Sequence, residues 1–193
     1  MSNINPFTLT IHMVSSLDGI IAKPDNSVSW FETTDDYEKG IVGQDGTDVL
    51  KSIDCYVMGA RTYEHALELS RSYGWAYGDT PTIVLTHRNL PIYGPTIEMY
   101  SGDIRAFVNE RLTPRYRNVW LVGGAMLSRE FIRLGLADEI RLTILPIILG
   151  NGLLFLDQVG REQELHVKEV TPYKNGMIEL WYGVGKRQVT NRQ

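Results

Sequence analysis

The chain has 193 residues and a formal net charge of −4, from 19 basic and 23 acidic residues. Hydrophobic residues make up 43% and charged residues 22%, which is the usage of a globular domain with one core and excludes a disordered or membrane protein. No long basic run occurs, which argues against nucleic acid as a partner, and no signal-peptide pattern precedes the first strand. We expect a cytoplasmic protein without membrane contact, with one domain over residues 1–185 and a frayed tail over 186–193.

The cysteine and the histidines indicate neither a disulfide nor a metal site. Cys55 is the only cysteine and lies in an apolar stretch, which favours a packed core residue over a catalytic thiol. The four histidines are scattered along the chain, and no two have the spacing of metal ligands on a helix. We therefore expect no metal.

In the first third of the chain, residues 7–14 predict a strand that ends in a long loop reaching Trp30. Thr33 and Thr34 then offer N-caps, and the two aspartates that follow suit a first helical turn. These features predict a helix over residues 33–43.

Strands and helices alternate through the middle of the chain. The glycine at 59 ends one buried strand and opens a helix, and the glycines at 123 and 124 do the same for a second strand. Such alternation is typical of a parallel sheet covered on both faces. The predicted elements are strands at 53–58, 82–86, 96–100 and 119–122, a helix after residue 59, a helix at 104–112 capped by Ser101 or Asp103, and a helix after residue 125.

The pattern changes after residue 137, where apolar and polar residues alternate at 140–144 and again at 165–168. Lys174-Asn175-Gly176 predicts a type I′ hairpin turn before a last strand at 178–184. The last two strands should therefore pair antiparallel, which makes the sheet mixed.

The two glycine turns indicate a ligand with phosphate groups. In an open α/β sheet, ligands bind at the carboxyl ends of the strands, where glycine lets the backbone approach a phosphate and a helix N-terminus faces its charge. For the paired glycines the alternative is a tight turn without a ligand.

Five motifs follow one another along the chain, namely Ser16 to Ala22, Ser29-Trp30, Met58 to Tyr63, Val122 to Leu127, and Asp138 to Thr143 followed by Pro146 to Gly150. In these motifs the chain resembles the dihydrofolate reductase-like superfamily, and most closely the reductase domain of the bifunctional riboflavin-biosynthesis deaminase-reductase. The resemblance implies a three-layer α/β/α fold with a central, mixed, mostly parallel eight-stranded sheet and a C-terminal antiparallel hairpin. It also implies NADPH as the hydride donor and a homodimer.

Carried over by position, the resemblance implies a set of cofactor-binding residues from five segments. Arg61 or Arg88 would read the 2′-phosphate, because guanidinium offers fork-like donors, and the alternative is that both are solvated loop charges. The loop that reaches Trp30 would cover the nicotinamide. Asp18 matches the loop aspartate of the family, which implies a catalytic role, and a β-turn of the Asp-Gly kind is an alternative at least as good. The cofactor set is Val14, Ile21, Ala22, Gly59, Arg61, Thr62, Thr86, His87, Arg88, Val122, Gly123, Gly124, Ala125, Met126 and Leu127.

The resemblance also implies the residues at the substrate. Asp35 falls where related reductases place an acidic residue, and it would bind substrate and relay a proton, with Glu32 and Asp36 beside it. Helix capping explains the same aspartates. Thr143 would hydrogen-bond the substrate or be an ordinary strand threonine, and Trp30 would line the substrate site.

The predicted function is NADPH-dependent hydride transfer to a small heterocyclic, pterin-like or pyrimidine-like, or carbonyl substrate. The chain departs from the riboflavin-pathway pattern because Val122 stands where those reductases usually carry a glutamate, and the zinc deaminase half is absent. The pattern of prolines around the lid tryptophan of classical dihydrofolate reductases is also missing. The alternative is a protein of the same fold that binds NADP(H) without turnover.

Overall fold

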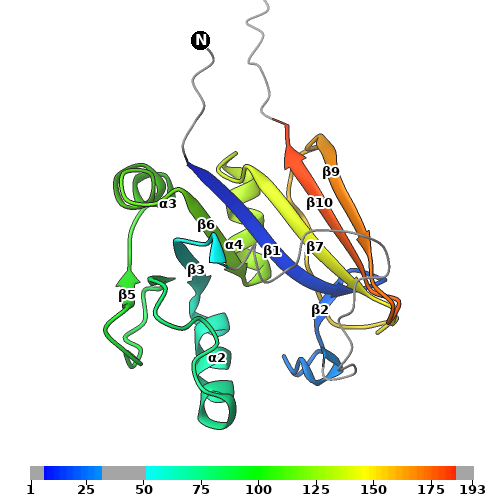
Figure 1. Ribbon diagram of the computed structural model, residues 1–193, viewed down its shortest axis with the longest axis horizontal. Helices are drawn as coiled ribbons and strands as arrows, with labels where there is room; N and C mark the ends of the chain where they lie inside the picture. The colour runs from blue at the N-terminus through cyan, green and yellow to red at the C-terminus, as the bar shows by residue number, and fades with distance from the viewer. Residues whose placement is uncertain (1–6, 32–50, 186–193) are drawn as a thin grey trace, which may run out of the picture.

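The computed structural model describes residues 7–31 and 51–185, and its centre is a sheet of eight strands (Figure 1). The strand order is β5-β4-β3-β6-β1-β7-β10-β9, and all neighbouring pairs are parallel except those of β10, which is antiparallel to both β7 and β9. The expected mixed, mostly parallel sheet is confirmed. Its strands are β1 (Thr8–Ser16), β3 (Cys55–Gly59), β4 (Thr82–Leu85), β5 (Ile97–Tyr100), β6 (Asn118–Gly123), β7 (Glu139–Leu145), β9 (Leu165–Pro172) and β10 (Ile178–Val184).

Helices cover both faces of the half of the sheet that contains β3 and β6. On β3, Val57 packs with residues of η2 (Phe107–Leu112) and α4 (Ala125–Arg133), whereas its neighbour Met58 packs with Tyr63 of α2 (Ala60–Tyr73). Successive side chains of a strand point to opposite faces, so these contacts assign α2 to one face and η2 and α4 to the other. The three-layer arrangement is confirmed.

The predicted helix over residues 104–112 is two segments. A short α3 (Ile104–Ala106) is capped by Asp103, whose carboxylate accepts a hydrogen bond from the backbone N–H of Ala106 at 2.8 Å. The chain then continues as the π-helical η2. Of the two caps predicted for this helix, Asp103 is therefore the one used.

The hairpin between β9 and β10 forms as predicted, but the predicted turn type is wrong. Gly176 has φ +86 and donates its N–H to the carbonyl of Tyr173 at 3.0 Å, whereas Asn175 does not have the positive φ that a type I′ turn requires. The loop consists of Lys174, Asn175 and Gly176, which is one residue more than the two of a type I′ hairpin loop. The glycine therefore takes the left-handed position after an ordinary turn.

A small second sheet joins β2 (Ile20–Ala22) to β8 (Leu153–Leu154). Gly152 fits against β2 only as glycine, because it has φ +153 and an added Cβ would lie 2.2 Å from the carbonyl oxygen of Ala22. The segment after β1 is thereby attached to the segment after β7, and η1 (Ser29–Phe31) follows β2.

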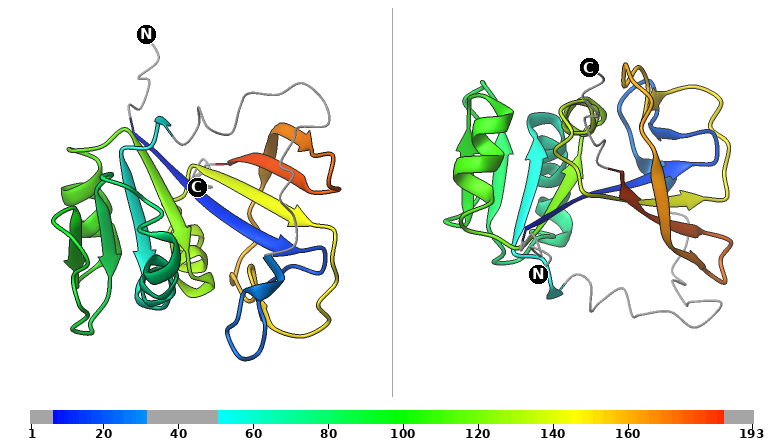
Figure 2. Two further views of the ribbon diagram at one scale, coloured as in Figure 1. Left: turned by 60° about the horizontal axis from the view of Figure 1, so that its bottom comes forward. Right: turned by 90° about the horizontal axis from the view of Figure 1, so that it is seen from above.

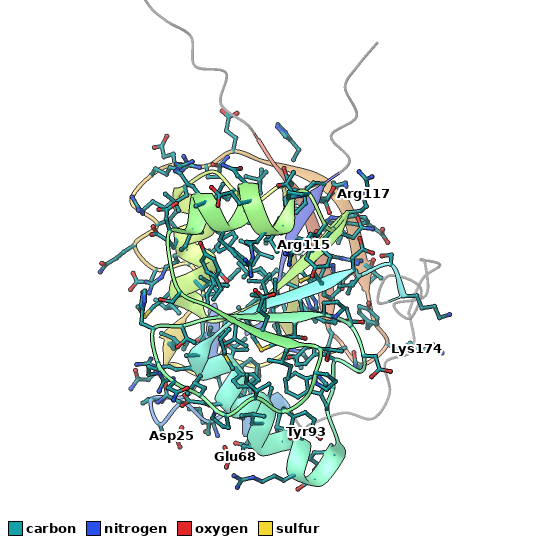
Figure 3. All side chains as sticks on the ribbon, turned by 90° about the vertical axis from the view of Figure 1, so that its left-hand side faces the viewer. Asp25, Glu68, Tyr93, Arg115, Arg117 and Lys174 are labelled. Atoms are coloured by element: carbon teal, nitrogen blue, oxygen red, sulfur yellow. The ribbon has the colours of Figure 1, made fainter. Side chains whose placement is uncertain are left out.

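The carboxyl ends of the parallel strands lie at one end of the molecule. Figure 3 shows Glu68 of α2 and Asp25, which follows β2, at this end, and it shows Arg115 and Arg117, which precede β6, at the opposite end. The sheet twists strongly, so that β9 and β10 run at a steep angle to β4 and β5 (Figure 2). A ligand at the carboxyl edge would meet β3, β6 and β1 together.

Candidate functional site

The two glycine turns predicted from the sequence lie side by side at the carboxyl edge. Met58 pairs with Gly123 across β3 and β6, and a Cβ added at Gly59 would lie 3.9 Å from the carbonyl oxygen of Gly123. Gly59 and Gly123 are 64 positions apart in the sequence, and the parallel pairing of β3 with β6 brings them together. The edge thus presents two stretches of backbone without side chains.

These glycines differ in what the fold requires of them. Gly123 has φ +126, and a Cβ there would lie 2.7 Å from the Met13 side chain, while Gly124 has φ +74. Both conformations favour glycine. Gly59 has φ −84, which any residue adopts, and its added Cβ would make only ordinary contacts. The fold therefore accounts for Gly123 and Gly124 but not for the glycine at 59.

Two helices begin at this edge with open N-termini. Gly59 is the N-cap of α2 and Gly124 is that of α4, and neither helix has a side-chain cap or an acidic residue in its first turn. The first N–H groups of a helix have no partner within the helix, and the helix dipole favours an anion there. Thr62 lies between the two starts, because its hydroxyl oxygen is 3.5 Å from the Cβ position of Gly124. This edge is suited to a phosphate group.

The residues predicted to lie beside the adenosine, Thr86 to Arg88, follow β4. The hydroxyl of Thr86 accepts a hydrogen bond from the backbone N–H of Arg88 at 2.9 Å, and His87 Nδ1 lies 2.6 Å from the hydroxyl of Ser101. The guanidinium of Arg88 binds the carboxylate of Glu64 on α2 at 2.7 Å. Arg88 thus already has an anionic partner.

Arg61 is the other predicted reader of the 2′-phosphate. It lies in the first turn of α2 and is exposed. Within the part of the chain that the structure describes, its guanidinium has no hydrogen bond or ion pair. Between the two candidate arginines, Arg61 is therefore the one with all its donors available to an added phosphate.

The remaining cofactor predictions fall on buried and exposed positions around the same turns. Ile21 and Ala125 are buried in the core, with Leu127 packed against it, so they shape the edge rather than face it. Met126 is 69% exposed at the start of α4. Val122 is partly buried on the α2 face of the sheet. Whether these residues contact a cofactor stays a prediction.

Asp18 stabilises the turn after β1 and attaches it to the loop after β7. Its carboxylate accepts hydrogen bonds from the hydroxyl of Ser16 at 2.5 Å, from the N–H of Gly150 at 2.8 Å and from the N–H of Leu149 at 3.2 Å. The Ser16 hydrogen bond is the first cause that lowers the pKa of Asp18 to about 2. Of the two roles considered for Asp18, the structure favours the turn, because all of these partners belong to loop backbone or to the turn itself.

Three predicted residues of the nicotinamide and substrate region come together at the ends of β1 and β7. Val14 pairs with Thr143 across the two strands. Trp30 is 4% exposed and packs with Leu145, with Val14 and Tyr173 at the margin of the same cluster. An indole and a strand hydroxyl therefore lie on one side of the sheet, beside the glycine turns. Asp35, with Glu32 and Asp36, lies outside the described residues.

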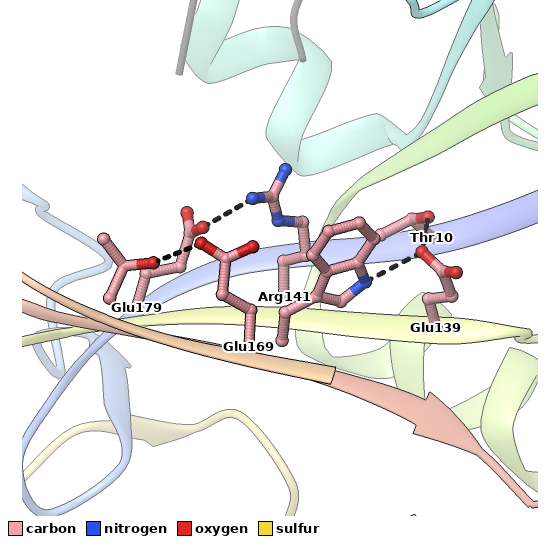
Figure 4. Close-up of polar contacts among 7 residues, drawn as sticks. Thr10, Glu139, Arg141, Glu169 and Glu179 are labelled. Carbon is pink, nitrogen blue, oxygen red and sulfur yellow. Dashed lines mark hydrogen bonds and ion pairs between the residues drawn. The ribbon is translucent and has the colours of Figure 1, made fainter. Parts of the chain in front are cut away.

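Sequence reasoning missed a polar network on this same sheet face (Figure 4). Arg141 is 7% exposed and binds Glu179 at 2.6 Å. Towards the amino end of β7, Glu139 accepts hydrogen bonds from the indole N–H of Trp181 at 2.8 Å and from Lys168 at 2.5 Å. The alternation of residues 178–184 could have placed Glu179 and Trp181 on one face, but only the strand register brings them to Arg141.

His12 is the cross-strand neighbour of Arg141 on β1, and it completes this face. Burial, and then the positive charge of Arg141, lowers the pKa of His12 from 6.5 to about 4. The imidazole is therefore neutral at pH 7, and its ring lies 4.6 Å from that of Trp120. Arg141 and Lys168 are the cations of this network.

Other chemistry finds little support in the described residues. Residues 7–31 and 51–185 contain no group of three histidine, cysteine, aspartate or glutamate side chains placed to hold a metal ion. Burial is the first cause that raises the pKa of the Cys55 thiol to about 12, so it is not a nucleophile at neutral pH. Of the helices that the structure describes, none is long and apolar enough to span a membrane.

Comparison with known proteins agrees with this arrangement. Residues 7–178 match the model of the RibD C-terminal domain. The uncharacterized protein YwjB of Bacillus subtilis (strain 168) is 29% identical over 173 residues, which cover 89% of this chain and 95% of YwjB. These matches indicate a reductase-like domain.

Solved structures extend the likeness at the level of the fold. A candidate riboflavin biosynthesis protein from Shewanella sp. PV-4 has a TM-score of 0.78 at 18% identity, over 93% of this chain and 100% of that one. A dihydrofolate reductase from Enterococcus faecalis in complex with NADP(H) has a TM-score of 0.55 at 15% identity, over 93% of this chain and 97% of that one. The expected dihydrofolate reductase-like fold is confirmed.

Proposed function

The chain belongs to the RibD C-terminal domain family, and from that premise we propose that it is an NADPH-dependent reductase of a small planar heterocyclic or carbonyl substrate. The observation that carries the proposal is the pair of adjacent glycine turns, each opening a helix without a side-chain cap. Gly59 adds to it, because the fold itself does not require a glycine there. A bound pyrophosphate group would explain the adjacent glycine turns, the two helix starts without a side-chain cap, and the glycine at 59.

The residues at the edge fit NADPH by their chemistry. The N–H groups that follow Gly59 and Gly124 would hold the pyrophosphate, and Arg61 would bind the 2′-phosphate with its unpaired guanidinium. Thr86 and His87 would flank the adenosine. When bound, NADPH would supply a hydride at the nicotinamide end, near Val14 and Ala22. The E. faecalis reductase with bound NADP(H) has the same fold, which supports this cofactor.

The substrate would lie beside Val14, against Trp30 and Thr143. Trp30 offers an aromatic wall that excludes water, and Thr143 offers a hydroxyl that can donate or accept a hydrogen bond. Asp35 would hold a proton for the product, as the resemblance implies. A planar ring fits this combination of an apolar wall and a polar strand face.

The proposal is tested by titrating the purified protein with NADPH and NADH, following the tryptophan fluorescence, to which Trp30 and Trp120 near the proposed site contribute. We expect micromolar affinity for NADPH and much weaker binding of NADH, followed by NADPH oxidation in a screen of pterins, aminopyrimidines and carbonyl compounds. Binding of NADPH with no oxidation across the screen would favour the alternative, a binder without turnover. Absence of binding of both nucleotides would contradict the proposal.

We further propose that the protein is a homodimer joined through β9 and β10. Val167 is 62% exposed, Val170 is 53% exposed and Ile178 is 41% exposed, on the face opposite the polar network. β9 is the last strand of the sheet, and its outer edge has no strand partner in the described chain. A second copy would present the same apolar edge strand to it. Val167→Glu should convert a dimer to a monomer in sedimentation velocity, and a monomeric wild-type protein would contradict the assignment.

A further inference from the structure

We propose that Glu179, held by Arg141 and facing Thr143, is the carboxylate that binds the N–H groups of a planar nitrogen heterocycle. This inference rests on the proposed function, because it deepens the description of the substrate end of that site. The carboxylate is supplied by the sheet itself, from β10, rather than by the helix predicted around Asp35.

The register places Glu179 beside Thr143. β10 runs antiparallel to β7, and Glu179 pairs with Thr143 while Trp181 pairs with Arg141. Residues directly opposite each other in an antiparallel pair point to the same face, with Cβ atoms about 4.5–5.5 Å apart. Val14 continues the row on β1, opposite Thr143. A carboxylate, a hydroxyl and the predicted nicotinamide contact therefore form one line across three strands.

The carboxylate of Glu179 is held in place through one of its two oxygen atoms. One carboxylate oxygen accepts a hydrogen bond from Arg141 at 2.6 Å, and the side chain is 15% exposed. Within the described chain, the second oxygen has no hydrogen bond. Arg141 also keeps a buried Nε–H without an acceptor in residues 7–31 and 51–185. The pair is thus anchored at one point and has hydrogen-bonding capacity left at two others.

Stability alone does not explain this pair. Burying two charges costs desolvation energy that the mutual attraction seldom exceeds, and an apolar pair of similar size is often as stable. An apolar cluster lies on the same face of β7, because Leu145, two residues beyond Thr143, packs with Trp30, and Tyr173 packs at the margin of that cluster. Burial, followed by the charge of Glu179, raises the pKa of Tyr173, which indicates that the phenol is close to this carboxylate. Aromatic walls and a fixed carboxylate together are the elements of a heterocycle site.

The charges on this face favour a donor-rich ligand over an anion. The polar network contains three carboxylates, Glu139, Glu169 and Glu179, and two cations, Arg141 and Lys168, while His12 is neutral at pH 7. Both cations are already paired with a carboxylate. A ring that carries amino groups can donate to Glu179 and exchange a hydrogen bond with the Thr143 hydroxyl. A phosphate or carboxylate ligand would be repelled.

The experiment uses two probes of the same ring. 2,4-Diaminopyrimidine carries N–H donors, and 2,4-dimethoxypyrimidine has the same ring without them. Dissociation constants are measured by ligand-observed NMR for the full chain and for Glu179→Gln and Glu169→Gln, with NADPH affinity measured separately by tryptophan fluorescence. Glu169 is the matched control, because it is a carboxylate on the same face that bonds Thr171 rather than an arginine.

We expect the wild-type protein to bind the diamino compound and not the dimethoxy compound. Glu179→Gln should weaken the diamino compound at least about tenfold, whereas Glu169→Gln should change it less than about twofold, and NADPH affinity should be unchanged in both. Equal binding by wild type and Glu179→Gln, equal losses in the two variants, or no preference for the diamino compound would overturn the inference.

A double variant guards against misfolding. Removing one member of the pair leaves an uncompensated charge, so the double variant Arg141→Met/Glu179→Met is also measured, because it removes both charges. It should fold, keep NADPH binding and lose the diamino compound, and retained binding of that compound would overturn the inference. Failure of the wild-type chain to bind NADPH contradicts the proposed function instead, and it is read independently of the two pyrimidine probes.

Discussion

The glycine edge and the β7–β10 face are built in opposite ways. At the glycine edge, β3 and β6 present backbone N–H groups and helix starts with few side chains. On the β7–β10 face, long charged side chains hold one another, as in the Arg141–Glu179 pair and the contacts of Glu139. A site made of backbone suits a ligand part that is always the same, such as a pyrophosphate, whereas a site made of side chains can be changed residue by residue. Under the proposed function, the cofactor would bind in the first region and the substrate would be selected in the second.

The largest effect is expected where the side-chain region is broken at one point. Arg141→Met leaves the Glu179 carboxylate buried without its cation, so we expect a loss of about 3–5 kcal/mol in the free energy of unfolding. The double variant with Glu179→Met should recover most of it. Urea denaturation of the two variants measures this, and a single variant as stable as wild type would mean that the pair is not desolvated.

A smaller effect is expected from acidification, again in the side-chain region. The pKa of His12 is lowered to about 4, so between about pH 6.5 and pH 4 the unfolded chain binds more protons than the folded one. Stability should therefore fall as the pH is lowered through this interval, by on the order of 2 kcal/mol.

The control for this prediction is His12→Gln, which should flatten the pH dependence in that interval. Asp18, whose pKa is lowered from 3.8 to about 2, contributes only below it, because its stabilisation is lost as the pH falls from about 4 to 2. Equal slopes for wild type and His12→Gln, measured by urea denaturation at each pH, would show that the buried imidazole is not the cause.

The smallest effect is expected at the rim of the glycine edge. Arg61→Ala should raise the dissociation constant of NADPH about tenfold, or about 1.4 kcal/mol, and leave that of NADH unchanged. Arg88→Ala should have a smaller effect, because Glu64 already neutralises that guanidinium. Fluorescence titration of both nucleotides against both variants measures this, and a larger loss for Arg88→Ala would reverse the assignment of the two arginines.

The two regions also differ in how far the sequence alone could describe them. The glycine edge was predictable, because Gly59 and the pair at 123 and 124 each follow an apolar run, and parallel strands bring their ends together. The strands of the large sheet also begin and end within a few residues of their predicted bounds, whereas β2 and β8 were not predicted. Local sequence patterns are sufficient to predict a site that is made of turns at the ends of neighbouring strands.

The β7–β10 face was not predictable in the same way. Arg141 and Glu179 are 38 positions apart, and their contact depends on the antiparallel register of β10 against β7. The predicted type I′ turn was also wrong, because one extra residue in the loop changes the turn while the strands still pair. Thr143 was singled out without its partner. Pairing across strands, rather than the order of residues along one strand, creates this part of the site.

The most direct test of the account is Gly59→Ala. Its φ of −84 and the ordinary 3.9 Å contacts at its Cβ position mean that alanine fits the fold, so the free energy of unfolding should change by less than about 0.5 kcal/mol. The methyl group would occupy the space where backbone approaches the pyrophosphate, so NADPH affinity should fall at least about tenfold. Gly94→Ala, at a position with no atoms near its Cβ, is the control and should change neither quantity. A Gly59→Ala protein that binds NADPH as tightly as wild type would contradict the cofactor site.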